Sequence, residues 1–518
     1  MRQFSFILAV TPGKSIPVCA VFLLSLSAQE CRTCHPKETA AFLSTAMGRS
    51  LGDPAQQPDG RFSHRLSDST ITIRHRAGIL EHSVETPGLS ATYPIAYAIG
   101  AGKVGYSYLT RIGQYLFQSP ASFYRQIGKW DLTPGYETEH RLDFTHQVTS
   151  GCLFCHTGSV RLVKGSDNRF DDPPFSPISC ERCHGPSEAH LAHPAKGTIV
   201  NPVNLTPSRR DGVCEQCHLE GEVRVLNPGK GWWDFEPGQE LESVFATYLK
   251  SGDSGKVRAV SQSELLAESH CSRSSGGKLW CGTCHNPHAP AENRAQQVRQ
   301  ICLNCHQSLF AEAKHKPAVE CVSCHMPRLR PDDVAHAAVT DHRIPRTAAA
   351  TVAQATTALH AWHEPPAGLK QRDLGLAYFE VASAERDSKL LHDAYELLSH
   401  LPAGARDPSV LADLGSILLS QHFNDQALRL FQQAVAAEPA NARYAYVLGM
   451  AFERSGNFMA AQTQLRRSIQ LDPSQPDPYV ALAAIYKGLG QDAMQQQILR
   501  EYLKFMPQNL SIRPPWGR

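Results

Sequence analysis

The hydrophobic and polar positions of this 518-residue chain follow three different patterns. A short apolar run, Val18 to Leu26, lies close to the amino terminus. Between about residues 60 and 130, apolar and polar residues alternate in short stretches, which indicates strands. From about residue 371 onward, helix formers dominate, and small and apolar residues recur at regular intervals. The segments between these patterns are rich in cysteine and histidine instead.

The apolar run near the start predicts an export signal over residues 1–28. Arg2 and Lys14 supply positive charge ahead of the run, and small residues up to Ala28 favour cleavage near that position. The run has about nine residues, whereas a bilayer span needs about 20, so an N-terminal anchor helix is the less favoured alternative. No later stretch reaches spanning length. We therefore expect no transmembrane span in the mature chain, and a location in the periplasm or at the cell surface.

The alternating stretches predict a small antiparallel sheet between about residues 60 and 130. Ile71-Thr-Ile-Arg-His, Gly105-Tyr-Ser-Tyr-Leu and Gln114-Tyr-Leu-Phe are examples, and Gly and Pro residues separate them. Such runs are typical of strands joined by tight turns. We expect this sheet to be a small β-rich insertion in a mainly α-helical protein.

The carboxy-terminal part repeats with a period of 34 residues. Pro439, Pro473 and Pro507 mark the period, and small residues such as Gly415 and Gly449 recur at the same interval. This pattern resembles tetratricopeptide repeats, in which small residues let paired helices approach and proline ends the second helix. The resemblance predicts an α-helical solenoid over 371–507, followed by a tail over 508–518. Its concave face would bind a peptide or protein, or the solenoid would be a packing platform for the rest of the chain.

Fourteen of the 16 cysteines form seven C-x-x-C pairs, and a histidine follows each pair directly. Only Cys19 and Cys271 remain outside the pairs. We number the pairs in chain order as motif 1 (Cys31, Cys34, His35), motif 2 (Cys152, Cys155, His156), motif 3 (Cys180, Cys183, His184), motif 4 (Cys214, Cys217, His218), motif 5 (Cys281, Cys284, His285), motif 6 (Cys302, Cys305, His306) and motif 7 (Cys321, Cys324, His325).

C-x-x-C-H is the attachment signature of c-type haem. The two thiols form thioethers with the porphyrin, and the adjacent imidazole becomes the proximal iron ligand. Zinc sites and disulfides are the alternatives. Zinc usually takes two such pairs per metal, and seven pairs is an odd number. Neither alternative accounts for a histidine at the same place each time. The motifs therefore predict seven covalently attached haem c groups.

Histidines outside the motifs are concentrated in the same region, where 12 of them lie between His64 and His342. That number would provide a second imidazole for every iron, which gives a closed, low-spin centre suited to electron transfer. His288 is too close to His285 to reach the far face of its own iron, so we expect it to bind a neighbouring one. The candidate distal ligands are His64, His140, His146, His190, His193, His288, His315, His336 and His342.

The region from about residue 30 to 345 resembles the multihaem cytochromes c that are grouped with the nitrifier tetrahaem cytochromes. The resemblance rests on C-x-x-C-H-G-P with a following histidine (Cys180–His190), C-x-x-C-H-x-P-H (Cys281–His288) and C-x-x-C-H-M-P (Cys321–Pro327). It implies closely packed haems, mostly with two histidine ligands, that conduct electrons. In that family a histidine commonly follows the first motif closely. Here the matching stretch, Ser44 to Met47, has none.

Composition narrows the remaining possibilities. Hydrophobic residues make up 42% of the chain, which excludes a disordered protein. Basic and acidic residues number 51 and 49, so no basic excess points to nucleic acid. We predict a mainly α protein: a heptahaem cytochrome c domain over 29–345, a linker over 346–370 and the repeats.

Two functions are compatible with these predictions. In the favoured one, the protein is an exported electron carrier that exchanges electrons with redox partner proteins, and its repeat domain holds a partner. In the alternative, one haem keeps an open site, and the protein is an oxidoreductase acting on small nitrogen or sulfur compounds such as hydroxylamine or nitrite.

Overall fold

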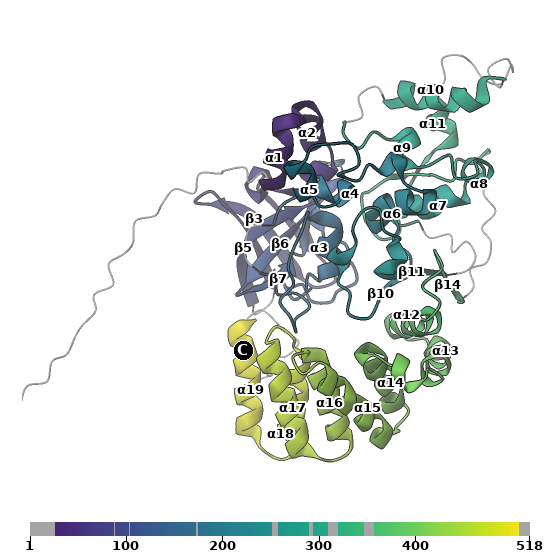
Figure 1. The fold of residues 1–518 in the computed structure, drawn as a ribbon. Coiled ribbons are helices and arrows are strands. Elements are labelled where there is room, and N and C mark those ends of the chain that lie inside the picture. The colour runs from purple at the N-terminus through teal and green to yellow at the C-terminus, as the bar shows by residue number, and fades with distance from the viewer. Residues whose placement is uncertain are drawn as a thin grey trace, which may run out of the picture.

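The computed structural model describes residues 26–86, 89–102, 104–171, 175–250, 257–289, 294–308, 320–346 and 357–506. The amino-terminal half contains a large sheet and many short helices, and the carboxy-terminal part is an arc of paired helices (Figure 1). The predicted export signal falls mostly outside the described residues. Within them, no helix is both long and apolar enough to cross a membrane.

A nine-stranded antiparallel sheet fills the long interval between motifs 1 and 2, in the order β2-β3-β4-β5-β6-β8-β9, with β1 on β5 and β7 on β6. Buried and less buried residues alternate along the central strands, as the sequence pattern predicts. The strands are β1 (Leu51–Gly52), β2 (Gly60–His64), β3 (Ser69–Arg76), β4 (Ile79–Thr86), β5 (Leu89–Ile99), β6 (Gly105–Ile112), β7 (Tyr115–Gln118), β8 (Ala121–Tyr124) and β9 (Lys129–Leu132).

The sheet curves until its two ends meet, which makes a nearly closed barrel. Trp130 on β9 donates a hydrogen bond from Nε1 to the carbonyl of Pro58, just before β2, at 3.0 Å. Its indole also lies against Gly60 on β2, where a Cβ atom would be only 2.2 Å from Trp130 Cδ1. Closure of this kind removes the exposed edges that an open sheet would present.

The prediction of a mainly α fold with a small β-rich insertion is wrong. Helices make up 46% and strands 17% of the described residues, and the amino-terminal region contains a large, nearly closed barrel. Barrel residues such as Ile71, Ile73, Leu80 and Val84 are buried in a hydrophobic core that continues into the last helices of the solenoid. The physical reason is the length of the interval without a motif: its apolar face has no porphyrin to cover it, so the sheet buries that face by curving on itself.

The helices of the motif region are short, and several of them end at the histidine of a motif. They are α1 (Leu26–Cys34), α2 (Pro36–Leu43), α3 (Ser150–His156), α4 (Glu181–His184), α5 (Glu188–Ala192), α6 (Pro207–His218), α7 (Gln262–Glu268), α8 (His270–Ser274), α9 (Cys281–Cys284), α10 (Arg294–His306) and α11 (Cys321–His325). Single 3₁₀ turns are η1 (Met47–Arg49), η2 (Pro54–Gln56), η3 (Pro202–Asn204), η4 (Trp232–Asp234), η5 (Leu241–Ser243) and η7 (Ala403–Ala405).

Two small sheets complete this half. One has the order β10-β11-β14 and the other joins β12 to β13; the strands are β10 (Val223–Leu226), β11 (Phe245–Lys250), β12 (Arg328–Leu329), β13 (Val339–Thr340) and β14 (Leu359–Ala361). Strand β14 comes from the segment predicted as a linker. Tyr248 and Leu359 on this sheet share a hydrophobic core with Leu376 of the first repeat helix. The junction is therefore a packed structural element.

Four helix pairs form the solenoid: α12 (Lys370–Glu385) with α13 (Ser388–Ser399), α14 (Pro408–Ser420) with α15 (Asn424–Ala437), α16 (Ala442–Arg454) with α17 (Phe458–Leu471), and α18 (Asp477–Gly488) with α19 (Asp492–Phe505). The small residues lie where the helices of a pair meet. A Cβ atom on Gly415 would be 2.7 Å from the Phe431 ring, and one on Gly449 would be 2.8 Å from Leu465. The close approach that the sequence pattern predicts is confirmed.

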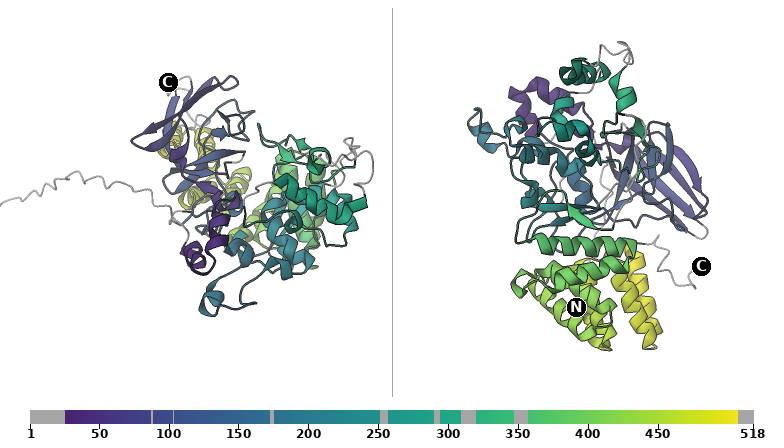
Figure 2. Two further views of the ribbon diagram at one scale, coloured as in Figure 1. Left: turned by 90° about the horizontal axis from the view of Figure 1, so that it is seen from above. Right: turned by 90° about the vertical axis from the view of Figure 1, so that its right-hand side faces the viewer.

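The solenoid lies along one side of the amino-terminal half and touches it at both ends (Figure 2). At its carboxy-terminal end, the rings of Phe505 and Tyr115 of the barrel pack edge to face, with centroids 5.5 Å apart. Nearby, buried Asp472 accepts a hydrogen bond from Ser166 Oγ at 3.0 Å, and Gln147 Nε2 donates one to Ser474 Oγ at 3.0 Å. These contacts make the solenoid an integral part of the structure.

Candidate functional site

The backbone places each motif on a helical turn or at its end. In motifs 2, 3, 4, 6 and 7 the helix runs through the second cysteine to the histidine. Residues three and four apart share one face of a helix, so the two cysteines and the histidine project to the same side. This local geometry brings two thiols and one imidazole to a single group.

Motif 1 lies next to motif 3, although their first cysteines, Cys31 and Cys180, are 149 positions apart in the chain. The thiols of Cys31 and Cys180 form a hydrogen bond. Burial, followed by this contact, raises the pKa of the Cys180 thiol to about 11.

Motif 4 is in contact with two other motifs and lies close to a third. Its Cys217 forms a hydrogen bond with Cys155 of motif 2, and this bond lowers the pKa of Cys155 to about 6. Its Cys214 forms a hydrogen bond with Cys281 of motif 5, which with burial raises the pKa of Cys214. Cys183 of motif 3 lies close to Cys214 as well.

The residues between the cysteines reinforce these contacts. Gln216 of motif 4 donates a hydrogen bond from Nε2 to the carbonyl of Arg182 in motif 3, at 2.8 Å. Arg182 in turn donates to the carbonyl of Phe154 in motif 2, at 3.0 Å, and its guanidinium lies over the Phe154 ring. Motifs 2, 3 and 4 thus form one bonded cluster.

Motifs 5, 6 and 7 continue from this cluster. Cys302 of motif 6 forms a hydrogen bond with Cys321 of motif 7 and lies close to Cys284 of motif 5. Burial, with smaller effects from these neighbours, raises the pKa of Cys302 to about 11. The spatial order of the motifs is therefore 1-3-4-5-6-7, with motif 2 beside motif 4.

Three motif histidines face a second histidine that follows a later motif. His35 and His190 have nearly parallel rings with centroids 6.4 Å apart, inclined by 23°. His184 and His288 are 5.8 Å apart at 19°, and His285 and His342 are 6.2 Å apart at 24°. Burial, and then the nearby His184, lower the pKa of His288, which favours its neutral, metal-binding form.

Hydrogen bonds at Nδ1 orient several of these rings. The Nδ1 atom of His184 donates to the Val200 carbonyl at 2.8 Å, and that of His325 donates to the Pro345 carbonyl at 3.0 Å. Nδ1 of His342 donates to the Thr340 carbonyl at 2.8 Å, and Nδ1 of His190 is bonded to Thr198 Oγ1 at 2.8 Å. In each ring this leaves Nε2 to bind a metal. A hydrogen bond at the other ring nitrogen commonly orients metal-binding histidines in this way.

Other predicted distal ligands lie elsewhere. His64 is bonded through Nδ1 to Ser67 at 2.8 Å, and His193 is exposed at the end of α5. His336 contacts Asp131 of the barrel through Nε2 at 2.7 Å. His315 lies outside the described residues. The structure brings none of these described rings onto a motif histidine.

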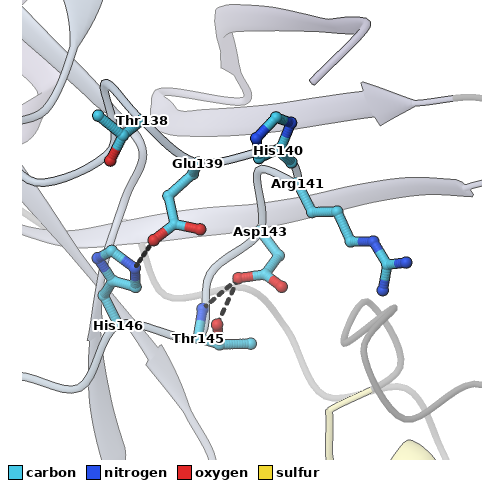
Figure 3. A pocket seen from close by; sticks show the side chains of 7 residues that line it. All are labelled: Thr138, Glu139, His140, Arg141, Asp143, Thr145 and His146. Atoms are coloured by element: carbon cyan, nitrogen blue, oxygen red, sulfur yellow. Dashed lines mark hydrogen bonds and ion pairs between the residues drawn. The ribbon is translucent and has the colours of Figure 1, made fainter. Parts of the chain in front are cut away.

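His140 and His146 line a polar pocket of about 400 Å³ next to the barrel (Figure 3). The His146 ring stacks on Tyr136, with centroids 3.9 Å apart, and its Nε2 lies 3.8 Å from Glu139. Asp143 accepts from the Thr145 hydroxyl, and burial raises the Asp143 pKa. The remaining lining residues are Thr138 and Arg141.

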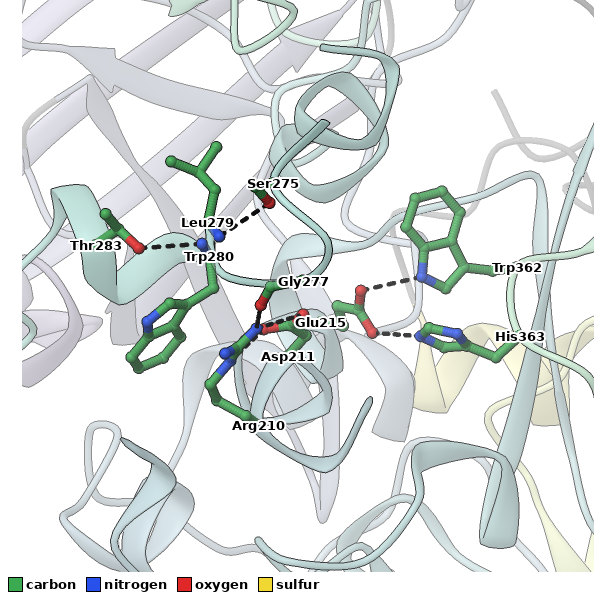
Figure 4. A network of polar contacts seen from close by, with 10 residues as sticks. All are labelled: Arg210, Asp211, Glu215, Ser275, Gly277, Leu279, Trp280, Thr283, Trp362 and His363. Atoms are coloured by element: carbon green, nitrogen blue, oxygen red, sulfur yellow. Dashed lines mark hydrogen bonds and ion pairs between the residues drawn. The ribbon is translucent and has the colours of Figure 1, made fainter. Parts of the chain in front are cut away.

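Sequence reasoning missed a group of residues that joins motif 4 to the start of the solenoid (Figure 4). Glu215, between the two cysteines of motif 4, accepts hydrogen bonds from Trp362 Nε1 at 3.0 Å and from His363 Nε2 at 2.8 Å. The donors lie 147 and 148 residues further along the chain, so no local pattern could have identified them.

The alternatives to haem are not supported by the geometry. All 15 cysteines within the described residues are free thiols, so no disulfide forms among them. The described part of the chain also contains no group of three or more histidine, cysteine or acidic side chains arranged to hold a metal, as a zinc site would need. The arrangement that does occur, two thiols and an imidazole facing a second imidazole, suits a porphyrin-bound iron.

Comparison with known families supports the same assignment. Residues 126–185 match the family of cytochrome c554 and c-prime, and residues 273–311 match a family described as a doubled CXXCH motif. Residues 412–476 match the tetratricopeptide repeat. The chain is a multihaem c-type cytochrome with tetratricopeptide repeats. These matches also support a role for the cytochrome in electron transfer, and protein partners for its repeats.

Solved structures similar to parts of this cytochrome include two described as MamA and one described as YrrB. A MamA structure labelled MSR-1 has 21% identity, covers 27% of this chain and 77% of its own, and has a TM-score of 0.24. MamA from Desulfovibrio magneticus RS-1 has 17% identity, covers 28% and 77%, and has a TM-score of 0.23. YrrB, described as a TPR protein with an unusual peptide-binding site, has 15% identity, covers 28% and 72%, and has a TM-score of 0.24. No curated protein matches the chain.

Proposed function

We propose that this protein is an exported heptahaem cytochrome that moves electrons along closely packed, mostly bis-histidine haems, and that its repeat region holds a protein partner. Haem c, when bound, supplies the one-electron couple between ferric and ferrous iron. The observation that carries the proposal is the set of three facing histidine pairs.

The separation within these pairs fits an iron between the two rings. A metal lies about 2.0–2.1 Å from an imidazole nitrogen and each ring centroid lies roughly 1.1 Å beyond that nitrogen, so two opposed rings have centroids about 6.3 Å apart. The three pairs have separations of 6.4, 5.8 and 6.2 Å. The chain itself therefore supports two axial imidazoles at motifs 1, 3 and 5.

The pairing follows a regular rule. His190, which faces motif 1, comes shortly after motif 3; His288, which faces motif 3, comes after motif 5; and His342, which faces motif 5, comes after motif 7. Each of these irons would thus tie together two segments that are distant in sequence. Coordination and folding are coupled in such an arrangement.

The spatial order of the motifs supports a continuous path for electrons. Motifs 1, 2, 6 and 7 each contain an exposed cysteine, at Cys34, Cys152, Cys305 and Cys324, whereas the cysteines of motifs 3, 4 and 5 are all partly buried. The ends of the path are thus the accessible ones, where partners would exchange electrons. Motif 4 lies at the junction between the branch to motif 2 and the path from motif 3 to motif 5.

Export follows from two different parts of the sequence. The apolar run Val18–Leu26 with its preceding positive charges has the character of a signal, and covalent attachment of haem c takes place outside the cytoplasm. Together they support a location in the periplasm or at the cell surface. A peptide or protein segment in the groove of the solenoid would then bring a redox partner close, which raises its effective concentration.

Two measurements on the purified holoprotein test the proposal. Intact mass should show seven covalently attached haems, and electron paramagnetic resonance of the oxidised protein should show low-spin signals that account for most of the iron. Fewer than seven haems would reject the heptahaem assignment. A strong high-spin signal, with turnover of hydroxylamine or nitrite by a reduced dye, would favour the oxidoreductase instead.

A further inference from the structure

The contact between Glu215 and His363 links the junction of the electron path to the segment that leads into the solenoid. Glu215 lies on α6 between Cys214 and Cys217, and its side chain is only 7% exposed. Both of its carboxylate oxygens are bonded, one to Trp362 and the other to His363. Trp362 and His363 directly follow β14 and precede α12 (Figure 4).

His363 is surrounded mainly by carboxylates. Helix α6 contributes Glu215 and Asp211, and the segment of η5 contributes Glu240 and Glu242, whose carboxylate lies 3.9 Å from His363 Nε2. Two of these carboxylates already have partners, because Arg210 binds Asp211 and Arg209 binds Glu240. On its own segment, the neighbouring Glu364 is paired with Lys370.

The environment of His363 favours its charged form. Burial alone would lower the pKa of its imidazole, but the hydrogen bond and charge of Glu215, with the charges of Glu242 and Asp211, raise it above the ordinary value of 6.5. The side chain remains 32% exposed and borders a surface pocket of about 490 Å³. A proton from solvent can therefore reach it, while Glu215 is shielded from water.

We propose that His363 is the proton acceptor coupled to reduction at motif 4, with Glu215 transmitting its charge. This inference rests on the proposed electron-transfer function, because it requires a haem at motif 4. When a redox partner supplies one electron to a haem held by motif 4, the His363 imidazole would take up one proton from solvent. The added negative charge and the added positive charge balance.

The sign of the coupling follows from Coulomb's law. The buried carboxylate of Glu215 beside the motif disfavours an additional electron, and a protonated His363 offsets the charge of that carboxylate. The reduction potential at motif 4 should therefore rise as the pH falls, through the range where His363 gains its proton. Because motif 4 lies where the path branches, this proton would regulate how electrons are divided between motif 2 and motif 5.

Potentiometric titration of the holoprotein, followed by visible absorption at a series of pH values from 5.5 to 9, tests the proposal, and the component of interest should account for about one haem in seven. In the unmodified protein, one component should shift with pH across the His363 range. In His363→Gln, that component should become independent of pH and remain at the low potential seen at high pH. In Glu215→Gln, it should also lose its pH dependence but lie at a higher potential, since the buried negative charge is gone.

A control and two outcomes separate the possibilities. His400→Gln removes a largely exposed histidine of the solenoid and should leave every component unchanged. If His363→Gln keeps the full pH dependence of all components, the inference is overturned, even when seven haems are present. If the proteolytic peptide that contains motif 4 lacks the mass of haem in the unmodified protein, the proposed function itself fails at this position. If His363→Gln and Glu215→Gln shift the reduction potential equally and in the same direction, the two residues have a purely structural role, and the inference is also overturned.

Discussion

The imidazole of His288 lies opposite that of His184, with ring centroids 5.8 Å apart and planes inclined by 19°. The two residues belong to different motif segments, and His184 is held by its Nδ1 bond to the Val200 carbonyl. This bond orients the His184 ring and leaves its Nε2 atom to bind a metal.

Replacement of His288 should change the spin state of one iron. On the proposed pairing, His288→Ala would remove the second imidazole at motif 3, and we expect a new high-spin signal that corresponds to about one iron in seven. His288→Met should keep a low-spin iron but raise its reduction potential. Electron paramagnetic resonance and potentiometric titration measure the two effects. His193→Ala, at an exposed position near His190, is the matched control and should leave both spectra unchanged; an identical result for His288→Ala would contradict the pairing.

The closure of the barrel can be tested at Gly60. A methyl group at this position would overlap Trp130, whose indole is held by its bond to Pro58 and by packing against Tyr108. We expect Gly60→Ala to lower the free energy of unfolding by about 1–3 kcal/mol. Thermal unfolding followed by circular dichroism provides the measurement. Gly52→Ala is the control, because the nearest atoms to its new methyl group are 3.9 Å away. Equal decreases in the free energy of unfolding of both variants would argue against closure of the barrel at Trp130 and Gly60.

The attachment of the solenoid depends on Asp472. This side chain is 1% exposed; it accepts hydrogen bonds from Ser166 Oγ in the amino-terminal half and from the Ser474 amide, each at 3.0 Å. Asp472→Ala leaves these donors without their partner, which should cost about 1–3 kcal/mol. Hydrogen exchange should also become faster around residues 165–170 and in α18. Asp425→Ala, at an exposed position on α15, should have little effect; unchanged exchange in Asp472→Ala would show that apolar packing alone holds this end.

The contact between His363 and Glu215 should make stability depend on pH. The folded-state pKa of His363 is raised above its ordinary value of 6.5. Its protonated form therefore contributes stability that is fully present below pH 6.5 and is lost as the pH rises through the folded-state value. The difference in Tm between the unmodified protein and His363→Gln should be largest near pH 5.5 and smaller near pH 8.5. Glu364→Gln, which alters an exposed carboxylate, should show no such trend; a difference that grows with pH would have the wrong sign.

Local patterns in the sequence predicted several features correctly. The period of 34 residues identified the helix pairs because Gly415 and Gly449 act within one repeat, against Phe431 and Leu465. The alternation around Ile71 and Ile73 identified strands because it is also a pattern among close neighbours in the sequence. What the alternation could not show is that β9 returns to β2, since the meeting of Trp130 with Gly60 joins positions 70 residues apart. The fold class was therefore predicted wrongly although the individual strands were expected.

The seven motifs show the same difference between local features, which the sequence predicts, and long-range contacts, which it does not. Two thiols and one imidazole on a single helical turn are specified by five consecutive residues, so the sequence by itself predicts where haem c would attach and which histidine would be proximal. Only the tertiary structure decided that His190, His288 and His342 face motifs 1, 3 and 5, and that Glu215 meets His363. These contacts join residues more than 50 positions apart, and the packing of the whole chain, including the solenoid against the barrel, selects among many possible partners. Spacing along the sequence does not identify these long-range partners.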